Sequence, residues 1–422
     1  MRFQRRGFLR SASGLALGAA APGLWGRLAC AAPDEGAPGG RGTVLVVVQL
    51  GGGNDGLNTV APVRDPSYIA ARPNLRVRPE QSLALAGGFA FHPKLKGMAD
   101  LLERSQLAVV QGVGYPNPNR SHFVSMDIWH RASFSEDDPV GWLGKASDHF
   151  ATGVGALHVG PGETPLAVEN RSGKSTSLQS IEDYRLKVAE YGDDPVRRLA
   201  IRGFAARGGD SASAASNPLL DKIRRTALET HASTERVDRV IRDEALQAKA
   251  ATGAATADGY PPGELGQRLK LVARLIAGGI PERVFFTAQD GYDTHASQAT
   301  AHGYLLGELG DSLAAFQKDL ERHKVADRVL TLVFSEFGRR VRENSSGGTD
   351  HGAASCLFLV GGAVNAGLHG VFPSMTDLDD GDLKHTVDFR RVYASVLDDW
   401  LGVPSSHIVG PGFAPLPVVR RS

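Results

Sequence analysis

Five short segments of the chain are almost continuously apolar, and each is followed by glycine or polar residues. Unbroken apolar runs of this length are typical of strands that are buried on both faces of a sheet. The pattern therefore predicts five buried strands, at residues 41–50, 107–114, 283–290, 328–338 and 356–362.

Segments with apolar residues at spacings of three and four lie between these runs. That spacing predicts amphipathic helices, at residues 92–105, 263–279, 302–324 and 388–402. Because helix and buried strand alternate, we expect an α/β fold with a mostly parallel central sheet flanked by helices on both faces.

Residues 205–263 interrupt the alternation. Two loop-like stretches rich in alanine, glycine and serine bracket a charged segment with helical periodicity. Predicted strands continue on both sides of this region. We therefore expect a helical insertion or cap within a single domain of residues 32–422.

The first 31 residues have the features of an export signal. Arg5 and Arg6 are followed by Phe8 and Leu9, by a mildly apolar run, and by the small residues 29–31. This order is that of a twin-arginine signal peptide. It predicts contact with the twin-arginine export machinery and a periplasmic or extracellular location.

Two cysteines, Cys30 and Cys356, occur in the whole chain. Lipidation of Cys30 is an alternative to cleavage after Ala31, although Arg27 stands where a lipidation motif has an aliphatic residue. Cleavage after Ala31 would leave Cys356 alone, so the mature fold would contain no intramolecular disulfide.

Composition limits the range of partners. The 422 residues are 42% hydrophobic and 22% charged, and the formal net charge is +1. A chain so nearly neutral gives no reason to expect nucleic acid. It also lacks any apolar stretch of the ~18 residues that would span a bilayer, so we expect no transmembrane span.

Acidic, imidazole and guanidinium side chains follow each predicted strand. Ligands of open α/β sheets bind outside the carboxyl ends of the strands, so we expect these side chains to share one edge. The candidates are Asp55 after the first strand; Arg120, Ser121 and His122 after the second; Asp293 and His295 after the third; Arg339, Asp350 and His351 after the fourth; and His369 after the fifth. Asn54, Asp290, Glu336 and Arg340 also follow strands.

Aspartate and histidine are ligands of zinc and similar divalent cations. Taken singly, each has an ordinary structural explanation: an aspartate after a strand often caps a helix, and a histidine is often only hydrogen-bonded. Their shared position favours metal ligation. We expect divalent metal ions, two of them, with zinc favoured and calcium, magnesium or manganese as alternatives. Two cations can polarise an ester and stabilise its leaving group.

Ser121 opens a helical segment and could act as a nucleophile beside a metal ion. A helix N-terminus favours an anionic phosphoryl or sulfuryl group, which Arg120 and Arg339 could clamp. In the alternative interpretation Ser121 only caps the helix and His122 is the working residue. Residues 51–53, three glycines, either bind an anion or simply let the chain turn.

Several motifs together resemble one bacterial family. They are "LGGGNDGLNTVAP", "NRSHF", "GYDTHASQ", "SEFGRRVRENSSGGTDHGAAS", "GLHG" and "VYASVLDDWLG". The chain resembles the family of domain of unknown function 1501, over nearly all of the mature sequence. That family is grouped with the alkaline phosphatase and sulfatase superfamily. The resemblance implies a sheet between helices and a two-metal site that hydrolyses esters.

Carried onto this chain, the superfamily pattern implies one metal held by Asp55, Ser121, Asp350 and His351. A second metal would be held by Asp293, His295 and His369. Asp293 and His295 are two residues apart where the superfamily has four, and Asp55 lies several residues beyond its strand. No Cys-x-Pro-x-Arg or Ser-x-Pro-x-Arg motif is present, which argues against a formylglycine sulfatase.

The sequence therefore predicts an exported, metal-dependent hydrolase of phosphate or sulfate esters that uses a serine nucleophile. Its substrate would be an anionic ester, attached to a polysaccharide or a lipid. The alternative is a non-catalytic envelope or surface protein that uses the same fold to bind a polysaccharide or a partner protein, because fold alone does not fix function.

Overall fold

A computed structural model of the protein describes residues 42–150, 155–171, 176–178 and 259–421. The predicted signal peptide, including Cys30, and residues 205–258 of the predicted insertion lie outside the described residues. None of the helices within the described ranges is long and apolar enough to cross a membrane.

A mixed sheet forms the centre of the fold. Among the described residues it has nine strands, in the order β11–β5–β10–β9–β1–β8–β6–β7, with β14 also paired to β5. The strands are β1 (Val44–Gly51), β5 (Leu107–Gly114), β6 (Ala156–Val159), β7 (Thr176–Leu178), β8 (Val284–Asp290), β9 (Val329–Ser335), β10 (Ser355–Val360), β11 (Gly367–His369) and β14 (Val387–Asp388).

All five predicted strands are confirmed, and all pairings are parallel except those of β10 with β5 and β9. A parallel return would need a crossover connection, usually a helix. The segment between β9 and β10 contains no helix, so β10 runs antiparallel to β9. The four strands that were not predicted are short or lie at the sheet edge.

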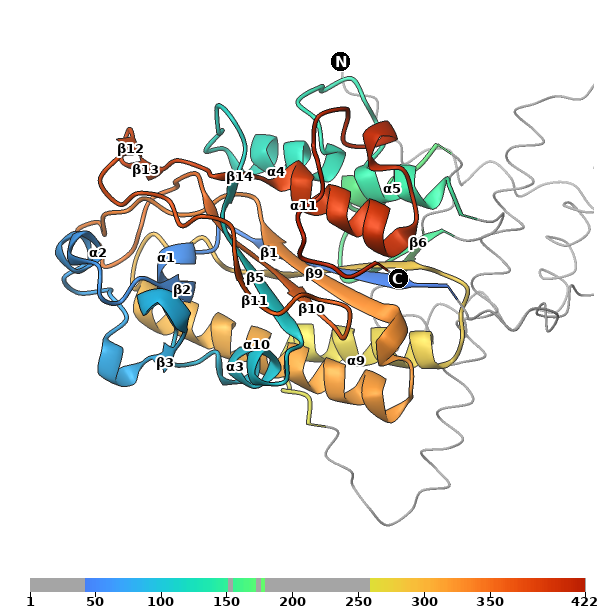
Figure 1. Cartoon of the computed structure of the whole chain (residues 1–422), viewed down its shortest axis with the longest axis horizontal. Coiled ribbons are helices and arrows are strands. Elements are labelled where there is room, and N and C mark those ends of the chain that lie inside the picture. The colour runs from blue at the N-terminus through green and yellow to red at the C-terminus, as the bar shows by residue number, and fades with distance from the viewer. Residues whose placement is uncertain (1–41, 151–154, 172–175, 179–258, 422) are drawn as a thin grey trace, which may run out of the picture. The chain divides into compact units, whose positions relative to one another are not determined.

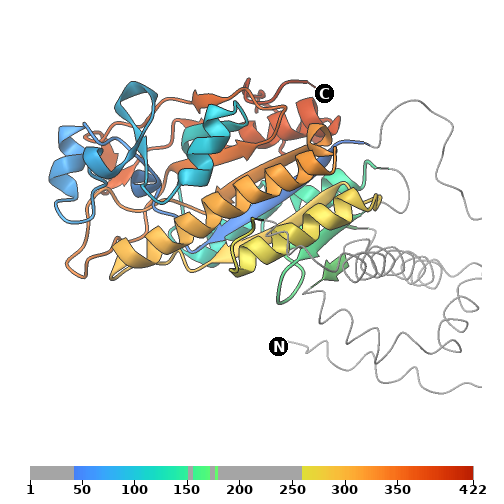
Figure 2. The ribbon, with the colours of Figure 1, turned by 90° about the horizontal axis from the view of Figure 1, so that it is seen from below.

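Helices cover both faces of the sheet (Figure 1). One face carries α3 (Lys96–Glu103), α9 (Glu264–Ala277) and α10 (Gln298–Arg322), and the other carries α4 (His122–Arg131), α5 (Trp142–Ser147) and α11 (Phe389–Ser395). Figure 2 shows α9 and α10 side by side across their face. The predicted helices and the predicted sandwich of helices around a mostly parallel sheet are confirmed.

Shorter elements complete the described chain. They are α1 (Gly56–Thr59), α2 (Pro66–Ala71), β2 (Val60–Ala61), β3 (Leu83–Ala84), β4 (Ala90–Phe91), β12 (Leu378–Asp379), β13 (Asp382–Leu383), the 3₁₀ turns η2 (Pro79–Gln81), η3 (Ala86–Gly88), η4 (Leu166–Val168), η5 (Ala326–Arg328) and η7 (Ser405–His407), and the π-helical turn η6 (Val396–Leu401).

The central strand β1 divides the core into two layers. Val44, Val46 and Val48 pack into the cluster formed with α3, α9 and α10. Leu45 and Val47 point the other way, into the cluster formed with α4, α5 and α11. Alternate side chains of a strand face opposite sides of its sheet, so a strand apolar at every position must be covered twice.

His130 of α4 is buried beneath the sheet, and its Nε2–H donates a hydrogen bond of 2.7 Å to Gln49 Oε1. Burial lowers the pKa of His130 to about 3, so the folded protein holds this ring neutral. In the unfolded chain its pKa is ~6.5.

We predict that His130 makes the fold labile to acid. Between about pH 6.5 and 3 the His130 ring is protonated in the unfolded state but not in the folded state. The free energy of unfolding therefore falls as the pH drops, by up to ~1.4 kcal/mol per pH unit. Urea unfolding at pH 7.5, 6.0 and 5.0 measures the decline, which should be shallower in a His130→Asn variant. If the free energy of unfolding fell equally steeply with pH in both proteins, His130 would not be the cause of the acid lability.

Candidate metal centre

The candidate side chains come from loops at the carboxyl ends of parallel strands. His122 follows β5 at the start of α4, Asp293 and His295 follow β8, and Asp350 and His351 lie in the long connection after β9. Parallel strands all end at the same edge of a sheet, which brings these distant segments together as the sequence predicts.

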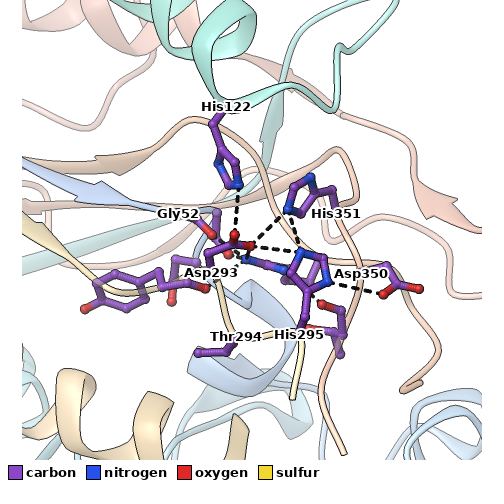
Figure 3. Close-up of polar contacts among 12 residues, drawn as sticks. Gly52, His122, Asp293, Thr294, His295, Asp350 and His351 are labelled. Atoms are coloured by element: carbon purple, nitrogen blue, oxygen red, sulfur yellow. Dashed lines mark hydrogen bonds and ion pairs between the residues drawn. The ribbon is translucent and has the colours of Figure 1, made fainter. Parts of the chain in front are cut away.

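Three imidazole rings surround the carboxylate of Asp293 (Figure 3). His351 Nε2 and His295 Nε2 each lie 3.0 Å from Asp293 Oδ1. His122 Nε2 lies 3.4 Å from Asp293 Oδ2. The two rings of His295 and His351 bring their Nε2 atoms within 2.9 Å of each other. The centre is open to solvent on one side, since the Asp293 side chain is 48% exposed.

The opposite nitrogen of each ring is bonded to an acceptor. Nδ1 of His122 lies 2.8 Å from buried Glu336 Oε1, and Nδ1 of His351 lies 2.8 Å from the carbonyl oxygen of Arg120. Nδ1 of His295 lies 3.4 Å from Asp350 Oδ1. Acceptors placed in this way fix the tautomer, so that the Nε2 lone pairs face Asp293.

This donor set fits a divalent cation. Atoms that bind zinc tetrahedrally at ~2.0–2.1 Å lie about 3.3 Å apart, close to the separations of 2.9 to 3.4 Å observed here. His122, Asp293 and His351 each offer a ligand atom, all within 4.8 Å of one another. His122 Nε2 is buried without a hydrogen-bond partner, which is costly for a polar atom unless it binds something else.

Neighbouring side chains keep the carboxylates of the centre ionised. Partial burial alone would raise the pKa of Asp293, but the hydrogen bond from Arg339 and the close approach of His351 outweigh it and hold the pKa well below its usual range. A hydrogen bond from Asn344 lowers the pKa of Asp350. Its bond to Glu336 raises the pKa of His122. The carboxylates are therefore ionised, which suits a cation.

Arg339 fixes the position of Asp293 from beneath. Its guanidinium is fully buried and donates a 2.8 Å hydrogen bond to Asp293 Oδ1. The same group donates to four backbone carbonyls, those of Gly52, Gly53, Tyr292 and Thr349. Arg339 thus joins the loops that follow β1, β8 and β9, and because its side chain is fully buried it is not placed to clamp a substrate as the sequence suggested.

A buried amide links the two loops that carry the centre. Gln298 Oε1, at the start of α10, accepts hydrogen bonds from Thr294 Oγ1 at 3.1 Å and from Thr349 Oγ1 at 2.6 Å. Thr294 stands between Asp293 and His295, and Thr349 directly precedes Asp350. One acceptor therefore sets the spacing of both loops.

Asp55 supports this amide and lies outside the centre. Its carboxylate accepts from Gln298 Nε2 and pairs with Arg72 at 2.5 Å, with both side chains fully buried. Burial would raise the pKa of Asp55, but Arg72 and Gln298 hold it low. The structure thus places Asp55 beneath the ligand loops and gives it protein partners where the resemblance implied a metal.

Of the remaining candidate residues, some lie beside the centre and one lies away from it. Ser121 is exposed at the N-cap position of α4 and makes no capping hydrogen bond, so its side chain does not serve as the cap. Arg120 is bound to Asp380 and Asp382, at 2.9 and 2.8 Å. His369 lies on β11 and contacts the carbonyl oxygen of Asn365. The structure does not bring His369 into the centre.

Sequence reasoning gave no role to Glu336, Gln298, Thr294 or Thr349. Glu336 is 1% exposed, directly after the buried strand β9, where an ionised side chain needs a partner. That position was the available signal. Nothing in the local pattern distinguishes Gln298 from an ordinary polar residue of a helix.

Residues 43–409 match the model of the family described as "Protein of unknown function (DUF1501)". The chain belongs to this family. The match spans every described loop of the candidate centre and confirms the resemblance drawn from the motifs. No curated protein matches the DUF1501 chain.

Similar solved structures are remote from this DUF1501 protein. They include the C-terminal periplasmic domain of EcEptC from Escherichia coli in complex with zinc, at 8% identity and a TM-score of 0.36, covering 76% of this chain and 73% of that one. A protein of the alkaline phosphatase superfamily from Vibrio parahaemolyticus matches at 8% identity and a TM-score of 0.32, over 76% and 60% of the two chains. Likenesses this weak carry no argument about the site.

We predict that Gln298→Leu destabilises the DUF1501 protein by about 2–4 kcal/mol, because it leaves two buried hydroxyls without an acceptor and removes one of the hydrogen bonds to the buried Asp55 carboxylate. Urea unfolding measures the change. Gln267→Leu, on the outer face of α9, is the matched control and should change stability by less than ~0.5 kcal/mol. An equally small effect at both positions would mean that the amide does not hold the loops.

Proposed function

We propose that this DUF1501 protein is an exported, metal-dependent hydrolase of phosphate or sulfate esters. The observation that carries the proposal is the convergence of three imidazoles on one carboxylate, each ring with its other nitrogen bonded to an acceptor. Such outer acceptors are characteristic of histidines that bind metal. The twin-arginine signal in the sequence supports export.

The cation would be held by His122, Asp293 and His351, with His295 beside them. Imidazole-rich sites favour zinc, whereas calcium and magnesium prefer oxygen ligands. Glu336 and Asp350 would act on the cation through the rings they orient. The second cation implied by the resemblance remains a prediction, since the described residues form one such group.

When bound, a divalent cation would polarise the ester oxygen and stabilise negative charge as the ester bond breaks. Ser121 would supply the nucleophile: its Oγ would bond to phosphorus or sulfur as the alcohol leaves, and water would then release the acid. Ser121 suits this role because it is exposed, lies between two residues that contact the centre, and stands at the N-terminus of α4, where amide groups favour an anion.

The metal prediction separates direct ligands from orienting residues. We expect His351→Ala to lose most of the bound cation. Asp350→Asn should weaken affinity by about 10- to 100-fold, because it disturbs only the ring of His295. Elemental analysis of protein purified without chelator gives identity and stoichiometry, and competition with a chromogenic chelator gives affinity. Full metal content in His351→Ala would refute this site.

The turnover prediction concerns Ser121. A screen of aryl phosphates, phosphodiesters and aryl sulfates on the metal-loaded protein should identify a cleaved ester. Ser121→Ala should then lower kcat by at least about 10³-fold with metal content unchanged. Ser135, exposed in the loop after the same helix, offers a matched control, since Ser135→Ala should retain metal and activity.

The same screen distinguishes the hydrolase from a non-catalytic binding protein. A metal-loaded protein that cleaves none of these esters would favour a non-catalytic envelope protein that retains the fold. Undiminished turnover by Ser121→Ala would leave the hydrolase standing but would remove Ser121 as its nucleophile.

A further inference from the structure

A cavity of about 410 Å³ adjoins the candidate centre on the α4 side. We call it the side pocket. His122, Asp293 and Glu336 form its inner end, and its walls are formed by Gln49, Phe123, Met126, Asp127, Leu166 and Asp290. Any ester cleaved at the centre has two parts joined at the reacting atom, and this cavity is directly adjacent to the place where they separate.

The outer wall of the side pocket presents apolar surface to water. Phe123, the second residue of α4, is 86% exposed although it directly follows His122. Met126, one turn further on, lines the same wall, and Leu166 also contributes apolar surface. Burying an aromatic side chain is favourable by roughly 1.5–3 kcal/mol, so a molecule that covered Phe123 would gain part of this free energy on binding.

The polar lining of the side pocket is acidic. Asp290 ends strand β8 and forms no salt bridge within the described part of the chain, whereas Asp127 is paired with Arg131 at 3.0 Å. Within the described part of the chain, no lysine or arginine lines the pocket. An anionic group would therefore be repelled. Ionised carboxylates only accept hydrogen bonds, so they match a ligand that carries hydroxyl donors.

We propose that the side pocket binds a neutral sugar ring, the alcohol part of the ester, stacked on Phe123 with hydroxyls donating to Asp290. This inference rests on the proposed function. A sugar combines a face of C–H groups with an edge of hydroxyls, which is the combination that the pocket presents. An ammonium group fits less well, because its recognition uses a cage of several aromatic rings and Phe123 is the single aromatic ring, other than histidines, in the lining.

A binding measurement tests the side pocket without requiring catalysis. Saturation-transfer difference NMR of the metal-loaded protein uses methyl α-D-glucopyranoside and ethanolamine as separate probes. We expect transfer to the glucoside, reduced at least threefold by Phe123→Ala and unchanged by Tyr304→Ala. Tyr304 is a suitable control because it is 68% exposed on α10, across the sheet. Stronger transfer to ethanolamine, or none to the glucoside, would overturn the proposal.

A turnover measurement tests the charge of the pocket. Glucose 1-phosphate and glucuronic acid 1-phosphate carry the same phosphoester on the same ring, but the second also bears a carboxylate. We expect kcat/KM to favour glucose 1-phosphate by at least tenfold, and Asp290→Lys to narrow or reverse that ratio. A preference for the glucuronic acid ester in the unmodified protein would overturn the proposal.

The two measurements fail separately. Binding of the glucoside through Phe123 without cleavage of any ester would leave the sugar site standing and refute the hydrolase. Cleavage of small esters without glucoside binding would support the hydrolase and refute the sugar site.

Discussion

The centre depends on one buried guanidinium. Asp293 keeps its charge among three imidazoles because Arg339, wholly removed from solvent, donates to the same oxygen that faces two of the rings. An unpaired ion so placed would be strongly disfavoured, and the four carbonyls around Arg339 share the task of solvating it. The guanidinium therefore both compensates a charge and gathers three loops that the sheet alone would leave independent.

A second buried network lies below the first. Arg72, Asp55 and Gln298 run from α2 to α10 and end at the two threonines of the ligand loops. Polar groups this deep stabilise a fold only when almost every donor and acceptor is satisfied, and they then permit a single arrangement. Buried residues thus fix the positions of the exposed imidazole rings.

Much of the fold could be predicted from the sequence, because a strand buried on both sides must be apolar throughout and an amphipathic helix must repeat its apolar face. The convergence of His122, Asp293, His295 and His351 followed from the rule about strand ends. The separate position of Asp55 could not be predicted in this way. An aspartate after a strand looks the same whether it faces a cation or Arg72, and only three-dimensional packing brings residues 17 positions apart into contact. The antiparallel β10 was missed because apolar pattern does not encode direction.

Cys356 is the cysteine of the described chain, and it is buried in β10 next to Ser355. Burial raises the pKa of its thiol to about 12, so almost none of it is thiolate at neutral pH. Thiolate, not thiol, is the form that attacks disulfides and captures soft metals. The sulfur is thus chemically unreactive, and neither oxidants nor copper ions should react with this domain at Cys356.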